Sequence, residues 1–383
     1  MKTRLMTGIL LVLLILAGCS NTEVRPGVYM SNDPADFPFP TSGYAIYIVG
    51  ETHGNKETKL IFLSYLQRLY EEAGLRDVIL EEDQAHESDA NAYVRGETAA
   101  LPARLCLRAD ILGQIREFNA SLPTNEKVSV HLVDVDSPLG TIHKHLTELH
   151  AQLGPAGEAV HFPDLDEFRS WRSTPMYELI DELRQAAGGQ PDILNGLDTV
   201  QLSLEWYYLG NRLEIGQPRG SRRVFAPLRE DVMTQNIQHV LSQLNGEPVL
   251  AFFGLGHGIK KAGNYNLPAE GFKSWAQRLV ESDVRVYSLA IVGTSGNGYW
   301  HKEAFEYEVI GNQQYEGTHE YQFADGTSLL SLFETHPELD IIHVDLQAED
   351  NANIRLPSGY DQDIAASRVF DGLVVFREFT PME

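Results

Sequence analysis

Two histidines stand at matching places in the two halves of this 383-residue chain. Residues 44–49 are apolar and lead into Gly-Glu-Thr-His, which ends at His53, and residues 249–253 are apolar and lead into Gly-Leu-Gly-His, which ends at His257. An apolar, β-rich run that ends in glycine and polar residues is typical of a buried strand followed by a loop. Because ligands of open α/β sheets bind beyond the carboxyl ends of the strands, the two histidines predict one composite site. This pattern indicates an enzyme.

Acidic side chains also follow the predicted strands of the first half of the chain. The acids at the successive strand ends are Glu51, then Glu81, Glu82 and Asp83, and then Asp134 and Asp136. Charged residues at one strand end are ordinary solvated loop, but their recurrence at several ends points to a common site. If the strands are parallel, these acids and the two histidines share one edge of the sheet.

Histidines and carboxylates can act on water in two ways, and the residue types leave both open. In the first, His53 held by Glu51 is a general base, and His257 is the acid or oxyanion donor. In the second, His53, His257, Glu51 and Glu82 hold a divalent metal that lowers the pKa of bound water. A serine or cysteine nucleophile has no support, because the sequence has neither a Gly-x-Ser-x-Gly elbow nor a paired Cys-x-x-Cys.

The elements that must position these residues follow from hydrophobic periodicity. Strands are predicted at 44–49, 77–81, 128–134, 248–253, 285–292, 340–344 and 371–377. Amphipathic helices are predicted at 57–73, which Gly74 ends, and at 229–244. Strands alternating with helices predict an α/β fold with a mostly parallel central sheet and helices on both faces.

The stretch 141–226 interrupts this alternation. Helical patterns near 142–153, 163–187 and 196–213, with no convincing strand between them, predict an inserted helical subdomain that can cap the site. The insertion contains His143, His145 and His150. On a helix only the first and the last of these share a face, so we interpret the three as solvated rather than as a metal site.

The N-terminus has the form of a bacterial lipoprotein signal. A basic start, a short apolar run and Leu-Ala-Gly-Cys predict a signal peptide over residues 1–18 and lipid attachment at Cys19. Residues 19–42 are rich in Pro, Asn, Asp and Ser and are predicted to be a tether. We therefore expect a lipid-anchored, extracytoplasmic protein of the cell envelope, held at the outer membrane if the host is Gram-negative.

The composition is that of a folded body with an acidic surface. Hydrophobic residues make up 43% and charged residues 22%, and the formal net charge is −24. Such a surface repels nucleic acid and anionic lipid. We expect membrane contact only through the Cys19 anchor and no nucleic-acid partner.

Several segments resemble the erythromycin esterase family. They are residues 50–57, 74–83, 91–96, 116–119, 133–138, 229–236, 370–376 and 380–381, which together span most of an α/β domain over 43–383. The resemblance implies that a histidine matching His53 is the general base for water attack on an ester. It also implies surrounding positions, which here are Glu51, Glu57, Glu82, Arg229 and Asn236.

The chain departs from that family in two places. Glu51 and His53 are two residues apart where the family has three, and only His257 is present where the family commonly has two histidines. The paired Gly-x-x-His motifs also resemble the TraB/TIKI group, which implies a metal-dependent protease. A Gly-Glu-x-His start on a lipoprotein resembles the ChaN-type group, which implies haem binding.

The sequence thus predicts a membrane-anchored hydrolase of ester or lactone bonds in a small-molecule substrate. Water is activated by His53, which Glu51 holds, while Glu82 and Asp134 orient the histidines or bind a metal. The alternatives are a metal-dependent peptidase and a haem- or metal-binding lipoprotein without catalysis. A general-base mechanism needs no cofactor, whereas the alternatives need a divalent metal or haem.

Overall fold

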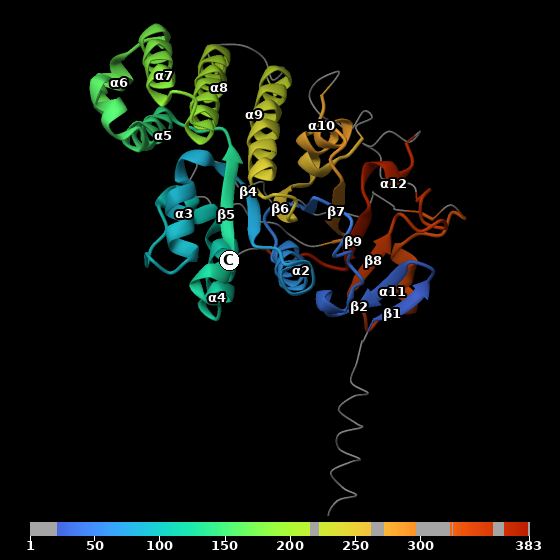
Figure 1. Cartoon of the computed structure of the whole chain (residues 1–383). Coiled ribbons are helices and arrows are strands. Elements are labelled where there is room, and N and C mark those ends of the chain that lie inside the picture. Colours follow the sequence, from blue (N-terminus) through green and yellow to red (C-terminus); the bar gives the residue numbers. More distant parts are fainter. Residues whose placement is uncertain are drawn as a thin grey trace, which may run out of the picture.

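One mixed β-sheet organises the chain. The computed structural model describes residues 21–214, 222–261, 272–295, 322–323, 325–354 and 364–381, and the described residues form nine strands in the order β1-β2-β8-β9-β7-β3-β6-β4-β5 (Figure 1). The strands are β1 (Thr22–Arg25), β2 (Val28–Ser31), β3 (Ile46–Glu51), β4 (Asp77–Asp83), β5 (Ser129–Asp134), β6 (Val249–Gly254), β7 (Val286–Gly293), β8 (Ile341–Asp345) and β9 (Gly372–Phe376). The strands from β9 to β5 are parallel, and the β1, β2 and β8 edge is antiparallel. The predicted α/β class with a mostly parallel sheet is confirmed.

Helices cover both faces of this sheet. The main-domain helices are α2 (Glu57–Ala73), α3 (Glu87–Val94), α4 (Ala109–Ala120), α9 (Arg222–Gln243), α10 (Trp275–Glu281), α11 (Leu330–Thr335) and α12 (Ala366–Val369). The predicted helix 57–73 is confirmed, and Gly74 ends it in the left-handed region at φ 71°. The helix predicted over 229–244 begins earlier, at Arg222.

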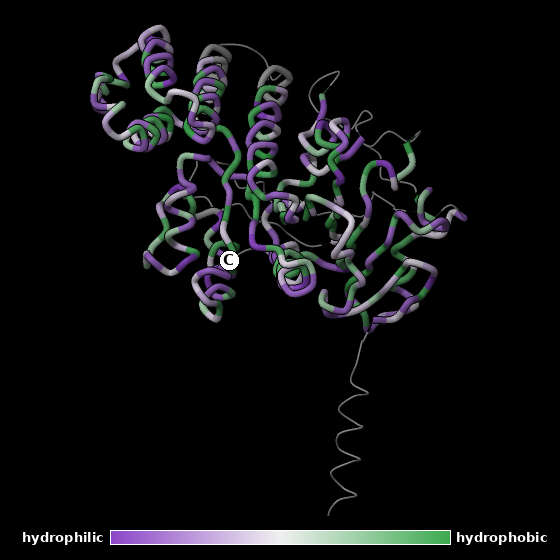
Figure 2. The backbone as a smooth tube through the Cα atoms, in the orientation of Figure 1, coloured by the Kyte–Doolittle hydropathy of each residue, from purple (hydrophilic) through white to green (hydrophobic). Residues whose placement is uncertain are grey.

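Each central strand has two apolar faces, as a parallel sheet buried on both sides requires. On β3, Tyr47 and Val49 pack toward α2 and α4, while Ile46 and Ile48 pack toward α9 and α10. The side chains of a strand alternate between faces, so consecutive residues of β3 belong to different cores. The tube view shows the hydrophobic central strands between helices with mixed hydropathy (Figure 2).

The helices after β5 form a group with a core of their own. This group consists of α5 (Leu139–Gln152), α6 (Leu165–Ser170), α7 (Ser173–Ala187) and α8 (Pro191–Glu214), and it lies beyond the carboxyl end of β5 (Figure 1). Its buried core joins all four helices and includes Leu146, Phe168, Leu183 and Leu197. The predicted helical insertion is therefore present as an α-helical layer.

The sheet edge at β5 is closed by side chains of α3. Asn91 accepts a hydrogen bond from the backbone N–H of Val130 (3.0 Å) and donates one to its carbonyl (2.7 Å). Glu87 accepts from the N–H of Leu132 at 2.9 Å. These contacts satisfy backbone groups that an edge strand would otherwise leave open to another chain.

The opposite edge differs from the prediction of a tether over residues 19–42. Residues 22–31 form β1 and β2, and β2 pairs with β8. Val28 and Met30 are fully buried on one side of β2, and Phe37 and Phe39 pack into the core behind it. The Pro- and Asp-rich composition hid this short alternation of buried side chains, which belongs to the folded body. The predicted signal peptide and Cys19 lie outside the described residues.

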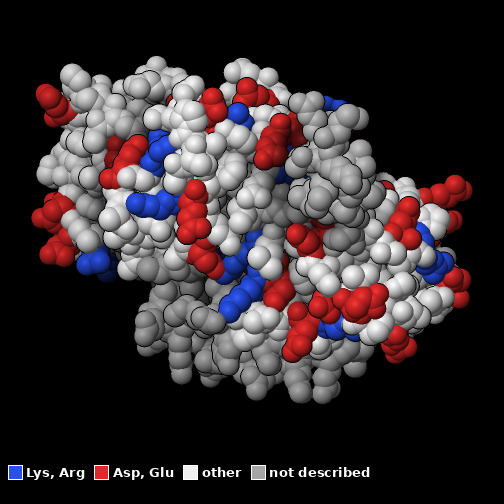
Figure 3. All heavy atoms as spheres, turned by 90° about the horizontal axis from the view of Figure 1, so that it is seen from below, with Lys and Arg blue, Asp and Glu red and all other residues white. Residues whose placement is uncertain are grey.

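Charged side chains of both signs lie on the face shown in Figure 3. Acidic side chains are spread over the face in Figure 3, with basic side chains lying between them. No helix in the described ranges has the combination of length and apolar composition that is needed to cross a membrane.

Candidate active site

The two motif histidines come together because their strands are neighbours. β3 and β6 pair in parallel, with Glu51 opposite Gly254 in the register. The segments after these two positions leave the sheet at the same edge, and the second of them is the 3-10 turn η7 (Leu255–Gly258). His53 and His257 therefore reach the carboxyl edge from adjacent strands, as the sequence predicts.

His53 is held at its Nδ1 by a buried carboxylate. Its Nδ1 lies 2.9 Å from Oε1 of the buried Glu51, and its side chain is 34% exposed. Its Nε2 lies over Gly254, and a Cβ atom added to that glycine would be only 2.9 Å from Nε2. A side chain at position 254 would displace the ring, so this glycine is required for the position of His53. When Nδ1–H donates to Glu51, the lone pair is on Nε2.

Arg108 joins Glu51 to Glu82 on the α4 side of the sheet. Its Nη1 donates to Glu51, and its Nε donates to Glu82 at 3.0 Å. Burial alone would raise the pKa of Glu51, but Arg108 and His53 lower it to about 2. Burial raises the pKa of Glu82 to about 7, because Arg108 offsets only part of the desolvation. Glu51 is therefore anionic at neutral pH, and Glu82 exchanges a proton there.

Arg229 joins the acids on the α9 side. It donates from Nε to Asp134 at 2.8 Å and from Nη2 to Glu81 at 2.6 Å. Glu81 also accepts the backbone N–H of Gly254 at 2.8 Å, which ties β4 to the end of β6. Although burial opposes ionisation, His257 and Arg229 lower the pKa of Glu81 well below its usual value.

His257 lies between two carboxylates. Its Nδ1 is 2.5 Å from Oε1 of Glu230, and its Nε2 is 3.3 Å from Oε1 of Glu81. The other oxygen of Glu230 accepts the backbone N–H of Trp275 at 2.6 Å, which fixes the carboxylate. Burial disfavours the imidazolium, but the two carboxylates raise the pKa of His257 to about 10. The ring is therefore a cation at neutral pH.

Three of the predicted supporting residues lie apart from the two histidines. Asp136 is fully buried and pairs with His145 at 2.6 Å. Glu57 accepts the backbone N–H of Thr380, and Asn236 donates to the carbonyl of Val133. These contacts hold together elements of the fold. Asp134 and Arg229 instead belong to the group of charged side chains around His53 and His257 at the carboxyl edge of the sheet, which we call the edge cluster. The buried His145 also corrects the prediction of a solvated histidine face.

Two residues of the edge cluster had no individual sequence signal. Arg108 stands at the end of the 3-10 turn η3 (Ala103–Arg108), and no spacing relates it to a strand end. Glu230 is adjacent to the predicted Arg229, and one residue along a helix turns the side chain toward a different partner. The only signal for Glu230 was its place in the segment 229–236, which carries part of the family resemblance.

The predicted metal ligands do not form a metal site. Within the described ranges, no group of three or more His, Cys, Asp or Glu side chains has the arrangement needed to hold a metal. Both nitrogens of His257 face carboxylates, and Arg108 engages both Glu51 and Glu82. With these donors already engaged by one another, the arrangement does not fit a metal ion.

The fold is shared with three solved structures over most of their length. A Bacillus cereus protein has TM-score 0.61 at 16% identity, covering 92% of this chain and 94% of that one. An erythromycin esterase, EreC, with a histidine-to-asparagine substitution and in its open conformation, has TM-score 0.59 at 13% identity, covering 90% and 93%. A succinoglycan biosynthesis protein has TM-score 0.57 at 13% identity, covering 92% and 94%.

The TM-scores over most of both chains establish a common fold, and the predicted erythromycin-esterase-like fold is thereby confirmed. No family model and no curated protein matches the sequence.

Proposed function

We propose that the chain is a hydrolase of carboxylic ester or lactone bonds that uses His53 as its general base. The observation that supports this role is the pairing of His53 with the buried, anionic Glu51, beside a second histidine that is already protonated. A histidine base and a nearby cation are the two elements that water attack on an acyl group needs. The fold shared with an esterase is consistent with this chemistry.

The proposed reaction begins with a water molecule at Nε2 of His53. The water oxygen attacks the acyl carbon while its proton passes to Nε2, and Glu51 stabilises the imidazolium that forms. The carbonyl oxygen gains negative charge near His257. The Nε2 contact of that ring with Glu81, at 3.3 Å, is longer than its 2.5 Å contact with Glu230. The Nε2–H is therefore the donor that a substrate oxygen can share.

Collapse of the tetrahedral intermediate completes the hydrolysis. The acyl carbon–oxygen bond breaks, and the leaving oxygen takes the proton held by His53, so the base returns to its starting form. Arg108 bridges Glu82 to Glu51. Glu82, whose pKa is about 7, can accept or return a proton at neutral pH. The charge of Arg108 keeps Glu51 ionised throughout.

The proposal includes attachment to the cell envelope through a lipid on Cys19. The lipoprotein-like start of the sequence supports it. Incorporation of a labelled fatty acid into the wild type, and not into Cys19→Ser, is the expected result. Equal incorporation into both proteins would disprove the assignment.

Hydrolysis of an ester and lactone panel tests the catalytic proposal. We expect His53→Ala to fold normally and to lose activity by about 10²-fold or more, the contribution of a positioned general base. His161→Ala is a matched control, because that histidine is on the surface with its side chain 80% exposed. Turnover unchanged in His53→Ala would refute the mechanism. Activity abolished by a chelator and restored by added metal would instead favour the metal-dependent alternative.

A further inference from the structure

A short segment crosses the carboxyl edge of the sheet from β9 to the loop that carries His53. It consists of residues 377–381, which we call the strap, and it follows β9 directly (Figure 1). In the sheet, β7 lies between β9 and β3, so the strap passes the end of β7 on its way to the start of α2. At about 3.3 Å per residue, this length of extended chain can span the roughly 10 Å, or two strand spacings, between β9 and β3.

The first half of the strap is fixed where β7 ends. The backbone carbonyl of Arg377 accepts hydrogen bonds from the hydroxyls of Thr294 at 2.5 Å and Ser295 at 2.8 Å. The backbone N–H of Phe379 donates to the carbonyl of Ser295 at 2.9 Å. The buried ring of Phe379 lies so close to Gly293 that a Cβ atom added to this glycine would be only 2.6 Å from it. A side chain at position 293 would therefore displace the strap.

The second half of the strap is fixed to the chain between His53 and α2. The backbone N–H of Lys56 donates to the carbonyl of Thr380 at 3.0 Å. Glu57, the buried first residue of α2, makes the return contact. Its two carboxylate oxygens accept the backbone N–H of Thr380 at 3.0 and 2.9 Å. Both backbone groups of Thr380 are thus used to hold the strap against the start of α2.

Asn55 connects the strap to the backbone beside His53. Asn55 and Pro381 form an isolated antiparallel bridge. The buried side chain of Asn55 donates to the carbonyl of Thr52 and accepts the backbone N–H of Thr58 at 3.0 Å. Because Thr52 immediately precedes His53, a displacement of the strap is passed through Asn55 to the backbone that carries the ring.

The helix that follows the loop does not depend on the strap for its place. Its fully buried face includes Ile61, Phe62 and Leu66, which pack into the core beneath β3. Burial of several large apolar side chains stabilises a helix more than one hydrogen bond does. Loss of the Glu57 carboxylate should therefore leave α2 in place and disturb only the loop, residues 52–56, and the strap.

We propose that Glu57 and the strap are positioning elements for His53, an inference that rests on the proposed function. Glu57 acts on the backbone of the loop, and the loop sets the approach of the His53 ring to Glu51, which is 2.9 Å from Nδ1. A general base works only when it is held close to its productive geometry, and a displacement of about 1 Å costs a large factor in rate.

Kinetics of full-length variants test this role with the best substrate of the ester and lactone panel. We expect Glu57→Ala to lower kcat about tenfold and to leave KM within about twofold of the wild type, because the base is displaced and the substrate contacts are kept. Glu57→Gln keeps an acceptor oxygen for the N–H of Thr380 and should restore most of kcat.

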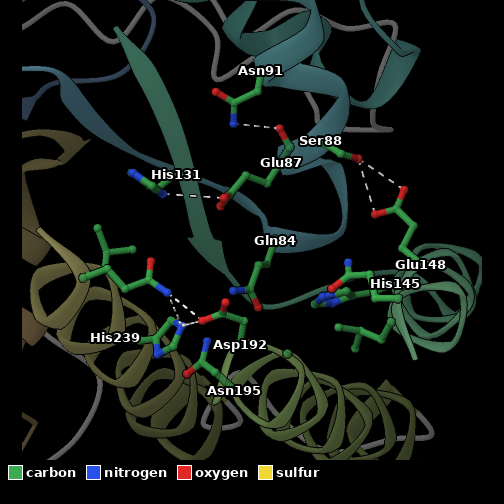
Figure 4. A pocket seen from close by; sticks show the side chains of 15 residues that line it. Gln84, Glu87, Ser88, Asn91, His131, His145, Glu148, Asp192, Asn195 and His239 are labelled. Carbon is green, nitrogen blue, oxygen red and sulfur yellow. Dashed lines mark hydrogen bonds and ion pairs between the residues drawn. The ribbon is translucent and has the colours of Figure 1, made fainter. Parts of the chain in front are cut away.

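Glu87→Ala is the matched control. Glu87 is also the first residue of a helix, α3, and also accepts a backbone N–H from another segment, that of Leu132 at 2.9 Å. It lies beside a polar cavity at β5, next to His131 (Figure 4), and β6 and β4 separate this strand from β3. General destabilisation would lower kcat in both variants, whereas a positioning role lowers it in Glu57→Ala alone.

NMR of the histidine rings gives a readout that does not need turnover. Glu57→Ala should move the imidazole signals of His53, and Glu87→Ala should move those of His131, which it contacts at 3.5 Å, and leave those of His53 in place. Full turnover in His53→Ala would refute the hydrolase mechanism, but the His53 signals would still decide whether Glu57 positions the ring.

If Glu57→Ala fails to fold, Phe379→Leu loosens the strap at the end of β7 and should give the same low kcat, unchanged KM and moved His53 signals. Wild-type kcat with unmoved His53 signals in the variant that folds would overturn the inference. An equal loss of kcat in Glu87→Ala, or no recovery in Glu57→Gln, would overturn it as well.

Discussion

His343 makes the stability of the fold sensitive to acid. This residue of β8 is 2% exposed, and its ring packs against Tyr29, Phe37 and Phe39 with centroid distances of 6.0, 5.4 and 5.0 Å. Neither ring nitrogen has a hydrogen-bond partner within the described residues. Desolvation by burial therefore lowers the pKa of His343 from 6.5 to about 3, so the folded protein holds it neutral.

The sign and the size of the effect follow from proton linkage. Between about pH 6.5 and pH 3 the unfolded chain binds a proton at this residue and the folded chain does not. The free energy of unfolding therefore falls as the pH falls through this window, by about 1.4 kcal/mol per pH unit. From neutral pH down to about pH 5, His343 alone should remove about 2 kcal/mol, a large part of a typical stability.

Urea unfolding at several pH values, followed by far-UV circular dichroism, measures this loss. His343→Leu cannot be protonated, so the variant should gain about 2 kcal/mol relative to the wild type between about pH 7.5 and pH 5. Glu82 and Asp83, whose pKa values are raised to about 7, titrate with the opposite sign but contribute equally to both proteins. His161→Leu, at an exposed position, should follow the wild type. Parallel pH profiles for wild type and His343→Leu would refute the reasoning.

Three further changes test other parts of the structure. Arg229→Met leaves two buried carboxylates without their cation and should lower the free energy of unfolding in urea by about 3 kcal/mol; an unchanged midpoint would show that water already screens them. Glu230→Gln removes the anion beside Nδ1 of His257 and should lower the pKa of that ring from about 10, as followed by NMR, while that of His131 stays near 9. Deleting residues 21–42 removes four buried apolar side chains and should cost more than about 5 kcal/mol, enough to unfold the protein; a folded product would restore the tether interpretation.

The sequence was sufficient to place the strands that build the site. Every predicted strand is present with its ends within about two residues, because buried parallel strands are continuous apolar runs bounded by turn residues. Strands β1 and β2 were missed because they lack such an apolar run. Each has only four residues, and they are separated by a turn at Gly27, so no apolar run marks them.

The identity of the second acid shows where sequence reasoning stops. Glu81 and Glu82 both end β4, and the prediction chose Glu82 for the catalytic set. Successive side chains of a strand point to opposite faces, so Glu82 meets Arg108 on the α4 side, while Glu81 meets His257 on the α9 side. Choosing Glu82 instead of Glu81 therefore places the predicted acid on the opposite face of the sheet from His257. Nothing in the local sequence states which face holds the second histidine.

This division between faces gives the two histidines of one sheet edge different electrostatic surroundings. On the α4 side, Nδ1 of His53 contacts Glu51, which Arg108 also holds, and the ring is partly exposed to water. On the α9 side, His257 lies between Glu81 and Glu230 in a buried position, and two carboxylates outweigh the cost of burying its charge. The positive charge of Arg108 lies against Glu51, the carboxylate that holds the proposed base. In the proposed route, the register of β3 and β6 sets the base, His53, and the cation of His257 at one edge of the sheet, which is the asymmetry that acyl hydrolysis by this route requires.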